Sequence, residues 1–369
     1  MRVLFLTSAH SSIDDRIYYH QAKSMCRDNQ VAIYSTYSGI SSKDDLIELT
    51  YDDRTFSSRK LKIEAFSTKC EEYLPDVVIC SEPIPILGAH QQRKKNKSSK
   101  YRILYDVTEF YPSKKNLQGL NGLKRLVKTI AMVQLNKKAA SLVDGFIFGE
   151  HFKSLFYKAH FKKKQSVYLP YYQDLSYFPL FQLPPSEFVI GYSGKFSEEK
   201  GIFRFAEVLN QFAKRQNSEN WRVVLIGWFA DKRTEEEFYF RTKDLQIELK
   251  ENMPFESYCK SLYDISVFMD LRDSDAENNL CVPIKLFTYA SAGRPVIYSA
   301  LQAIESAYPN EKFITNKRTE DLQGMVEKLS QYYENRSELE IDCDAAFHFA
   351  RNHQWDIIKE DFIRFVTHT

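Results

Sequence analysis

The sequence has no apolar run close to the ~20 residues that a membrane-spanning helix needs. Its six cysteines show no CxxC spacing, and we interpret them as buried thiols of a protein in a reducing cytoplasm. Short-period repeats and low-complexity tracts are also absent. The segment Met1 to Thr7 is followed by no small-residue cleavage site, so it predicts a first strand and not a signal peptide.

Several familiar catalytic motifs are missing as well. No GxGxxG follows the first predicted strand and no GxxxxGK[ST] occurs, so nicotinamide and P-loop functions lose their main support. HExxH, GxSxG and Cys/His pairs with metal-ligand spacing are absent too. Asp270, Asp273 and Asp275 follow a predicted strand, where they form either a metal-binding carboxylate cluster or, as is commoner, a polar loop.

The chain is long and apolar enough to bury real cores. Its 369 residues are 43% hydrophobic and 27% charged, which predicts two domains and excludes disordered, collagen-like and disulfide-stapled classes. The net charge of +2 is unevenly distributed: residues 1–180 hold 28 Lys and Arg against 18 Asp and Glu, and the rest hold 23 against 31. Residues 91–140 hold 13 basic and two acidic residues, net +11. The two halves therefore favour different partners.

Short buried runs alternate with helical segments, which predicts parallel α/β structure in two successive doubly wound units. Four prolines fall within residues 170–186 and indicate a linker or an extended crossing between the units. We place the domains at residues 1–178 and 187–350. The expected elements include strands at Val3–Leu6 and Phe188–Tyr192, and helices at Asp15–Arg27, Leu117–Ser141, Ile202–Ala213, Pro283–Ala292 and Trp355–Val366.

The strongest local signal is the turn after the strand Phe188–Tyr192. Ser193 and Gly194 let the backbone approach a ligand, and Lys195 and Lys200 stand nearby as positive charges. The amides of the following helix favour an anion, so the turn predicts a diphosphate site. An ordinary strand-to-helix turn with solvated lysines is the alternative.

A second anion signal lies at the start of the helix Pro283–Ala292. Pro283 is favourable in a first helical turn, and Gly293 with Pro295 ends the helix. The free amides of Ile284 and Lys285 would point at a ligand over this N-terminus. Both anion signals fall at strand ends of the second predicted sheet.

Four segments together resemble family-four glycosyltransferases of the GT-B fold. PIKLFTYASAGRPVI is similar to the donor-binding helix PxKLFEYMAAGxPVI, and GYSGKFSEEKGI to the phosphate-contacting turn of these enzymes. HSSIDDRIYYHQAKSM, from His10 to Met25, resembles HPPxDxRIxxxEAKSL of one subgroup. YDVTEFYP, from Tyr105 to Pro112, resembles that subgroup's YDVHExYP. The four matches occur in the family's order over nearly the whole chain.

The resemblance implies an α/β fold of two Rossmann-like domains facing a cleft. It also implies that the final helix crosses back, so that residues 351–369 complete the N-terminal domain. The implied activity is that of a retaining, metal-independent transferase with no cofactor and a nucleotide-sugar donor, a UDP-sugar more than a GDP-sugar. The donor would lie in the C-terminal domain, with Lys195, Lys200, Ser193 and Gly194 at its diphosphate and the Pro283–Lys285 turn adding amides.

The chain departs from the family at several positions. Thr288 stands where the family has a glutamate that grips the ribose, and Leu280 where it has the partner glutamate. Glu277, Asn278 and Asn279 lie close enough in sequence to contact sugar hydroxyls instead. Thr108 replaces the histidine of YDVHE. A threonine cannot copy a bidentate carboxylate contact, so the donor is held differently, held more weakly, or not turned over.

The first domain supplies the other candidates. Asp106 and Glu109 end a strand, where either orients an acceptor hydroxyl or serves as a strand-end cap or a solvated acid. His10 follows the first strand and either touches the sugar or phosphate or is a plain loop residue. Arg16 is expected to form a surface pair with an acid.

We therefore expect a glycosyltransferase of bacterial surface polysaccharide synthesis acting on a glycan or lipid-linked acceptor. The alternatives are an inactive GT-B scaffold and a sugar-nucleotide epimerase. Nucleic acid is not an expected partner, because the basic half carries no recognisable motif. Residues 91–140 combine basic and apolar residues and predict contact with an anionic membrane, or else a solvated face. The expected location is cytoplasmic, at the inner face of the plasma membrane.

Overall fold

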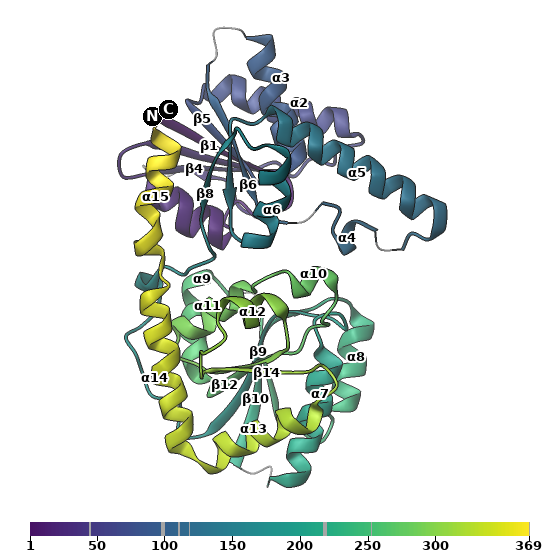
Figure 1. Ribbon diagram of the computed structural model, residues 1–369, viewed down its shortest axis with the longest axis vertical. Coiled ribbons are helices and arrows are strands. Elements are labelled where there is room, and N and C mark those ends of the chain that lie inside the picture. The colour runs from purple at the N-terminus through teal and green to yellow at the C-terminus, as the bar shows by residue number, and fades with distance from the viewer. Residues whose placement is uncertain are drawn as a thin grey trace. The chain divides into compact units, whose positions relative to one another are not determined.

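The computed structural model describes residues 1–43, 46–96, 100–109, 111–117, 119–216, 220–251 and 253–368, with only the backbone for Lys43, Lys114 and Lys115. Contacts divide the chain into two compact units (Figure 1). One holds Met1–Tyr171 with Asp356–Thr369, and the other holds Tyr172–Trp355.

The first unit is built on an eight-stranded sheet with the order β3-β4-β2-β1-β5-β6-β7-β8. Every neighbouring pair is parallel except β3 with β4. The strands β5 and β7 are buried along their whole length, as parallel strands covered on both faces should be. The strands are β1 Arg2–Thr7, β2 Gln30–Ser35, β3 Ser42–Lys43, β4 Ile47–Tyr51, β5 Val77–Cys80, β6 Arg102–Val107, β7 Gly145–Phe148 and β8 Gln165–Tyr168.

Two predicted helices of this unit differ from the structure. The segment Asp15–Ala22 is π-helical, with wider turns, and only Lys23–Met25 (α1) is α-helical. The long basic helix is interrupted, because Gly119 adopts a left-handed φ of 72° that an α-helix cannot contain. The helices of the unit are α1, α2 Arg59–Tyr73, α3 Pro83–Lys95, α4 Lys114–Leu117, α5 Gly122–Leu142, α6 His151–His160 and α15 Trp355–Thr367.

The second unit has a parallel six-stranded sheet with the order β11-β10-β9-β12-β13-β14. Its strands are β9 Phe188–Phe196, β10 Trp221–Phe229, β11 Ile247–Lys250, β12 Val267–Asp270, β13 Val296–Ser299 and β14 Ile314–Lys317. Its helices are α7 Ile202–Arg215, α8 Lys232–Arg241, α9 Phe255–Ser261, α10 Ala276–Asn279, α11 Ile284–Ser291, α12 Gln302–Ala307, α13 Leu322–Glu334 and α14 Arg336–Asn352. Helix α7 buries its apolar face, including Phe205, Leu209 and Phe212, in the core of this unit.

The proline-bearing segment predicted as a linker is part of the second unit. The buried guanidinium of Arg294 donates to the carbonyl oxygens of Gln182 and Leu183. The carbonyl of Gln173 accepts a hydrogen bond from the backbone N–H of Trp355. The unit boundaries therefore lie at 171/172 and 355/356, where the sequence placed them at 178 and 351.

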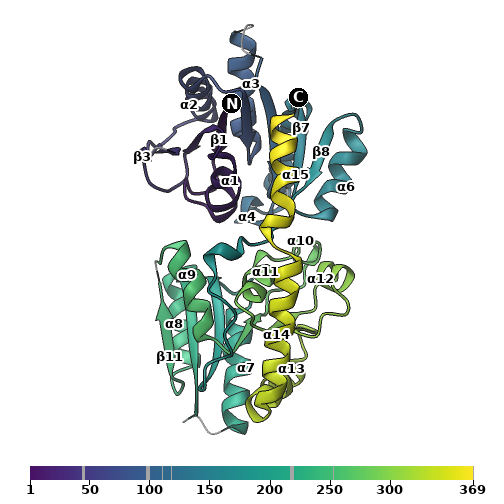
Figure 2. The same cartoon turned by 90° about the vertical axis from the view of Figure 1, so that its left-hand side faces the viewer.

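The last helix, α15, belongs to the first unit, as predicted (Figure 2). Phe362 and Val366 are completely buried, and Gly145 of β7 lies against the ring of Phe365. Arg102 donates to the backbone oxygens of the same helix end, 2.8 Å from that of His368. The first sheet is therefore completed by a helix that follows the whole second unit in sequence.

Among the described residues, no helix combines the length and the apolar character needed to cross a bilayer.

Candidate functional site

Both sheets reverse their strand order beside their first strand. In the second unit the chain adds β10 and β11 on one side of β9, and β12, β13 and β14 on the other. Doubly wound sheets bind ligands outside the carboxyl ends of the strands at such a switch point. The predicted diphosphate turn lies at the end of β9, and Asp270 ends β12 with Asp273 and Asp275 beyond it, so both groups lie at this point.

Gly201 ties the turn after β9 to the end of β12. Its φ is 83°, and a Cβ atom there would lie 1.8 Å from the carbonyl oxygen of Leu271. No other residue type fits, because any side chain would collide with this backbone. The Lys200-Gly201 pair noted in the sequence thus brings a lysine to the ends of two neighbouring strands.

The side chain of Lys285 joins the two anion signals. It extends from the start of α11, and its Nζ lies 4.9 Å from the ring centre of Tyr192. A Cβ atom on Gly194 would lie 3.2 Å from this Nζ, so the ammonium group sits directly against the turn after β9. The sequence predicted a contribution from the backbone of Lys285; the structure adds its side chain.

The surroundings of Lys285 make the protonated, charged form of its side chain less favourable than it is in water. Burial lowers its pKa most, and the charges of Arg272 and Lys200 lower it further, while Asp270 raises it. The pKa is lowered to about 8. An anion placed here would relieve this repulsion, which makes the group suited to a phosphate.

Asp270 is the counter-ion of this cluster. It is completely buried, accepts hydrogen bonds from Arg272, and lies 3.7 Å from Lys285 Nζ. Although burial alone would raise its pKa, Arg272 and Lys285 hold the pKa below the ordinary value. Asp273 pairs with Arg204, and Asp275 caps α10. Within the described ranges no three metal-binding side chains come together.

The two predicted phosphate lysines occupy different surroundings. Lys200 is half-buried beside the Asp270 cluster and lies 3.4 Å from Glu199. Lys195 is exposed at the end of β9. Its positive charge helps to lower the pKa of Asp231, the residue that caps α8. Lys200 and Lys285 are therefore brought together, and Lys195 lies on the other side of the turn.

Ser193 serves the packing beneath the turn. It is completely buried, and its Oγ lies 2.8 Å from the hydroxyl of Tyr289 and 3.1 Å from that of Tyr258. This network links β9 to α11 and α9. We infer that Ser193 positions the turn through these hydroxyl groups.

The start of α11 differs slightly from the expectation. Pro283 is the capping residue and Ile284 is the first helical residue. Helix geometry leaves the N–H groups of Ile284 and Lys285 without a partner inside α11, as the sequence predicted. These amides lie at the same strand-end site as the Lys285 side chain.

Thr288 and two of the polar residues near it in the family pattern, Asn278 and Asn279, make hydrogen bonds to residues close to them in the chain. The hydroxyl of Thr288 donates to the carbonyl of Ile284, 3.2 Å away. Asn278 donates to Asp275 and Asn279 donates to the carbonyl of Ser274, each at 2.9 Å. Glu277 is partly exposed on the short helix α10.

The first unit has its own switch point, between β1 and β5, where His10 lies beside the partly buried Asp14 and the buried Glu82. His10 Nδ1 lies 3.2 Å from Asp14, and Nε2 lies 3.6 Å from Glu82 and 3.2 Å from the hydroxyl of Thr108. Burial lowers the pKa of His10, but the hydrogen bond and charge of Asp14, with Glu82 and Glu109, raise it to about 10. His10 is therefore a fixed cation at neutral pH.

Glu82 was not singled out from the sequence. It is 3% exposed, and its carboxylate accepts hydrogen bonds from the hydroxyl of Thr7 and the backbone N–H of Ser8. The signal in the sequence that could have identified Glu82 is its position just after the strand Val77–Cys80, because such sheets bind ligands at the carboxyl ends of their strands.

Asp106 is paired inside the first unit. Its two oxygens accept hydrogen bonds from Arg16 at 2.8 and 2.9 Å, and Gln21 adds a third at 2.6 Å. Arg16 is also buried, so the prediction that it forms an ion pair on the surface is wrong. Both charged groups of the pair are shielded from water. This environment favours a structural role for Asp106. Glu109 is exposed; its neighbour Phe110 lies outside the described residues.

Comparison with known proteins places this geometry in a known architecture. Sucrose-phosphate synthase from Thermosynechococcus elongatus superposes with a TM-score of 0.73 at 14% identity, over 99% of this chain and 98% of that one. WaaG, a glycosyltransferase involved in lipopolysaccharide biosynthesis, gives 0.72 at 13% identity, and HepE from Anabaena in complex with UDP gives 0.71 at 10%, each over the full length of both chains. The fold is GT-B. No family model and no curated protein matches the sequence.

Proposed function

We propose that this protein is a retaining glycosyltransferase of GT-B fold. It transfers a sugar from a nucleotide-sugar donor, a UDP-sugar in preference to a GDP-sugar, to a glycan or lipid-linked acceptor of a bacterial surface polysaccharide. The observation that carries the proposal is the meeting of Lys285, Lys200 and the turn at Gly194 at the switch point of the second sheet. The similarity to HepE, whose structures hold UDP and UDP-glucose, supports the choice of donor.

The chemistry needs a stabilised leaving group. When the bond between the sugar and the diphosphate breaks, negative charge grows on the phosphate oxygens. Lys200 and Lys285, with the amides of Ile284 and Lys285, are placed to stabilise this charge, and Lys195 binds from the other side of the turn. Such a reaction proceeds on these groups without a metal ion or a side-chain nucleophile.

Glu109 is the carboxylate in the first unit that we assign to the acceptor. It is exposed, whereas Asp106 is enclosed by Arg16 and Gln21. An exposed carboxylate can orient an acceptor hydroxyl. His10 contributes fixed positive charge to the same strand-end region.

Titration calorimetry with UDP tests the donor site. Lys200→Ala and Lys285→Met should each weaken binding about tenfold or more, because each removes a charge-assisted phosphate contact. Lys195→Ala should weaken it less, since this side chain is exposed. Lys214→Ala, at the far end of α7, is the matched control; equal affinities in all four variants would remove these lysines from the site.

The alternatives predict different products. An inactive scaffold binds UDP-sugar but neither hydrolyses nor transfers it, and Thr288 and Thr108 are the reason to test for this outcome. An epimerase converts the sugar nucleotide into an isomer without an acceptor. Incubation with UDP-glucose, followed by chromatography of the nucleotides, separates the three functions.

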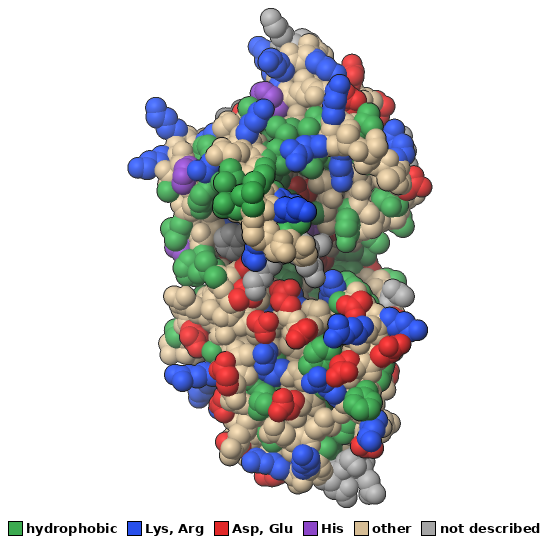
Figure 3. Space-filling model, turned by 90° about the vertical axis from the view of Figure 1, so that its right-hand side faces the viewer, with side chains coloured by type: hydrophobic (Ala, Val, Ile, Leu, Met, Phe, Trp, Pro, Cys, Tyr) green, Lys and Arg blue, Asp and Glu red, His purple; other side chains and the backbone are tan. Residues whose placement is uncertain are grey.

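The exposed side chains of helix α5 favour attachment of the protein to a membrane surface. Leu123, Leu126, Val127 and Ile130 are 53–75% exposed, and Lys124, Arg125 and Lys128 lie among them with no acid in the helix. Figure 3 shows hydrophobic side chains of the first unit gathered beside Lys and Arg on the face toward which α5 points. We propose that this segment holds the protein on the inner, anionic face of the plasma membrane, where a lipid-linked acceptor resides.

A further inference from the structure

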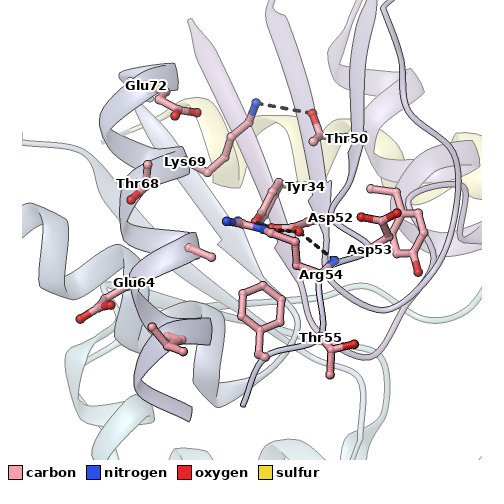
Figure 4. A pocket seen from close by; sticks show the side chains of 14 residues that line it. Tyr34, Thr50, Asp52, Asp53, Arg54, Thr55, Glu64, Thr68, Lys69 and Glu72 are labelled. Atoms are coloured by element: carbon pink, nitrogen blue, oxygen red, sulfur yellow. Dashed lines mark hydrogen bonds and ion pairs between the residues drawn. The ribbon is translucent and has the colours of Figure 1, made fainter. Parts of the chain in front are cut away.

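The first unit contains a pocket at the carboxyl ends of β2 and β4 (Figure 4). It has a volume of about 650 Å³, within the range of ligand sites. Helix α2 forms one wall, and the chain following β4, from Asp52 to Phe56, forms the other. The pocket lies on the same edge of the sheet as His10, because the hydroxyl of Ser35 at the end of β2 donates to the His10 carbonyl.

The two cations at this pocket are already paired. Arg54 makes two hydrogen bonds to Asp52, whose carboxylate also accepts one from the hydroxyl of Tyr34. Lys69 lies 2.7 Å from Glu48 on the strand beside it. Each of these two positive charges is therefore balanced by a carboxylate. Lys62, which does not itself line the pocket, lies 6.0 Å from the centre of the ring of Phe56, which does.

The acceptors that remain are carboxylates and hydroxyls. Glu64, Thr68 and Glu72 follow one another at intervals of four along α2, so they share one helical face over about 12 Å. Asp53 and Thr55 line the opposite wall. In the described part of the chain no cation pairs with Asp53, Glu64 or Glu72.

The wall also offers an aromatic surface. Phe56 is partly buried, and Arg54 lies 5.6 Å from the centre of its ring. A pocket with free carboxylates, hydroxyls and one ring suits a ligand that is rich in hydrogen-bond donors and has an apolar face. A saccharide has both, whereas a phosphate or a carboxylate would be repelled.

We propose that this pocket binds a saccharide unit without anionic groups, a neutral hexose or an amino sugar. If the protein is the transferase proposed above, the bound unit is part of the acceptor, and the acceptor is then a glycan longer than the single sugar that receives the transfer. The acceptor role rests on the proposed function, but sugar binding at the pocket does not.

Saturation-transfer NMR on the full chain tests the proposal with three probes: lactose, glucosamine and glucuronic acid. Lactose and glucosamine should receive saturation, and glucuronic acid should not. Thr68→Trp, which places an indole in the pocket from an exposed position, should abolish both signals. Glu64→Gln and Glu72→Gln should each weaken glucosamine roughly fivefold, because a charge-assisted contact becomes a neutral one.

Glu71→Gln is the matched control, since Glu71 is exposed on the same helix and does not line the pocket. It should bind glucosamine like the unmodified protein. No signal from either lactose or glucosamine, a glucuronic acid signal of the same strength, or an equal loss in Glu71→Gln and Glu72→Gln would each overturn the proposal. Titration of the same variants with UDP reports the donor site separately, so failure of the pocket and failure of the transferase assignment remain distinguishable.

Discussion

The side chain of Lys285 connects the two segments that the sequence predicted to bind an anion. Its backbone amide and its ammonium group both face the switch point of the second sheet, beside Gly194 and opposite Asp270. The sequence indicated both segments, but not that the side chain of one would reach the turn of the other. That contact depends on the packing of β9 against α11, which no local pattern encodes.

The lowered pKa of Lys285 predicts a pH dependence of UDP binding. Affinity should fall by up to about tenfold between about pH 7 and 9, as the group loses its proton around its pKa of about 8. In Lys285→Arg, which stays charged, affinity should be flat over this range. Calorimetry across the range measures both, and an equally flat profile for the unmodified protein would contradict the assignment.

The lowered pKa of Lys285 also affects stability, and in the opposite direction: the rise in pH that weakens UDP binding should stabilise the folded protein. The unfolded chain keeps this proton up to the ordinary pKa of 10.5, so between about pH 8 and 10.5 the unfolded state binds more protons than the folded one. The contribution of Lys285 to the free energy of unfolding should therefore increase as the pH rises through this window. Urea unfolding of the protein and of Lys285→Met should show a pH-dependent difference of this sign.

Removal of the buried guanidinium of Arg16 should cause a large loss of stability. Arg16→Leu leaves Asp106 buried without its counter-ion and should cost about 3–5 kcal/mol of unfolding free energy. Arg54→Leu breaks an ion pair of similar geometry, but Arg54 is 68% exposed, so the cost should stay below about 1 kcal/mol. Equal losses in the two variants would show that burial of the Arg16 pair does not matter.

At the scale of elements, α5 stands out by the apolar surface it leaves uncovered. Replacing Lys124, Arg125 and Lys128 together by glutamine should weaken binding to anionic vesicles by about 100-fold, at ~1 kcal/mol for each charge. Binding of the unmodified protein should also fall as salt is added. Sedimentation with phosphatidylglycerol vesicles, and with neutral vesicles for comparison, measures both effects.

A control for total charge is available in the second unit. Lys214, Lys232 and Lys243 are exposed, and their replacement by glutamine removes the same total charge from the second unit. This variant should bind vesicles normally. If it loses binding as much as the α5 variant does, net charge and not α5 determines attachment.

The elements also show what sequence patterns can and cannot predict. Strands such as β1 and β9 were predicted because they are short apolar runs buried on both faces. Helices α2 and α3 were not, because polar and charged residues interrupt their apolar face. The pairing of Arg16 with Asp106, 90 residues apart, was missed although both residues had been singled out.

At the scale of the whole molecule, α15 links the end of the chain to the first sheet. Phe362→Ala should lower the stability of the first unit by about 3–5 kcal/mol, because the ring is completely buried. Ile357→Ala, on the same helix but 56% exposed, should change it by less than about 0.5 kcal/mol. UDP affinity, which we assign to the second unit, should be unchanged in both variants. Thermal unfolding with and without UDP distinguishes the two units.

The place of α15 also orders events during synthesis on the ribosome. The second unit is complete once residue 355 has emerged, whereas the first, though begun earlier, must wait for residues 356–369. Until then Arg102 lacks its carbonyl partners and the ring of Phe365 is missing from Gly145, so the nascent first unit exposes an apolar surface. A stop codon placed between positions 356 and 369 would therefore damage the half of the protein that was made first.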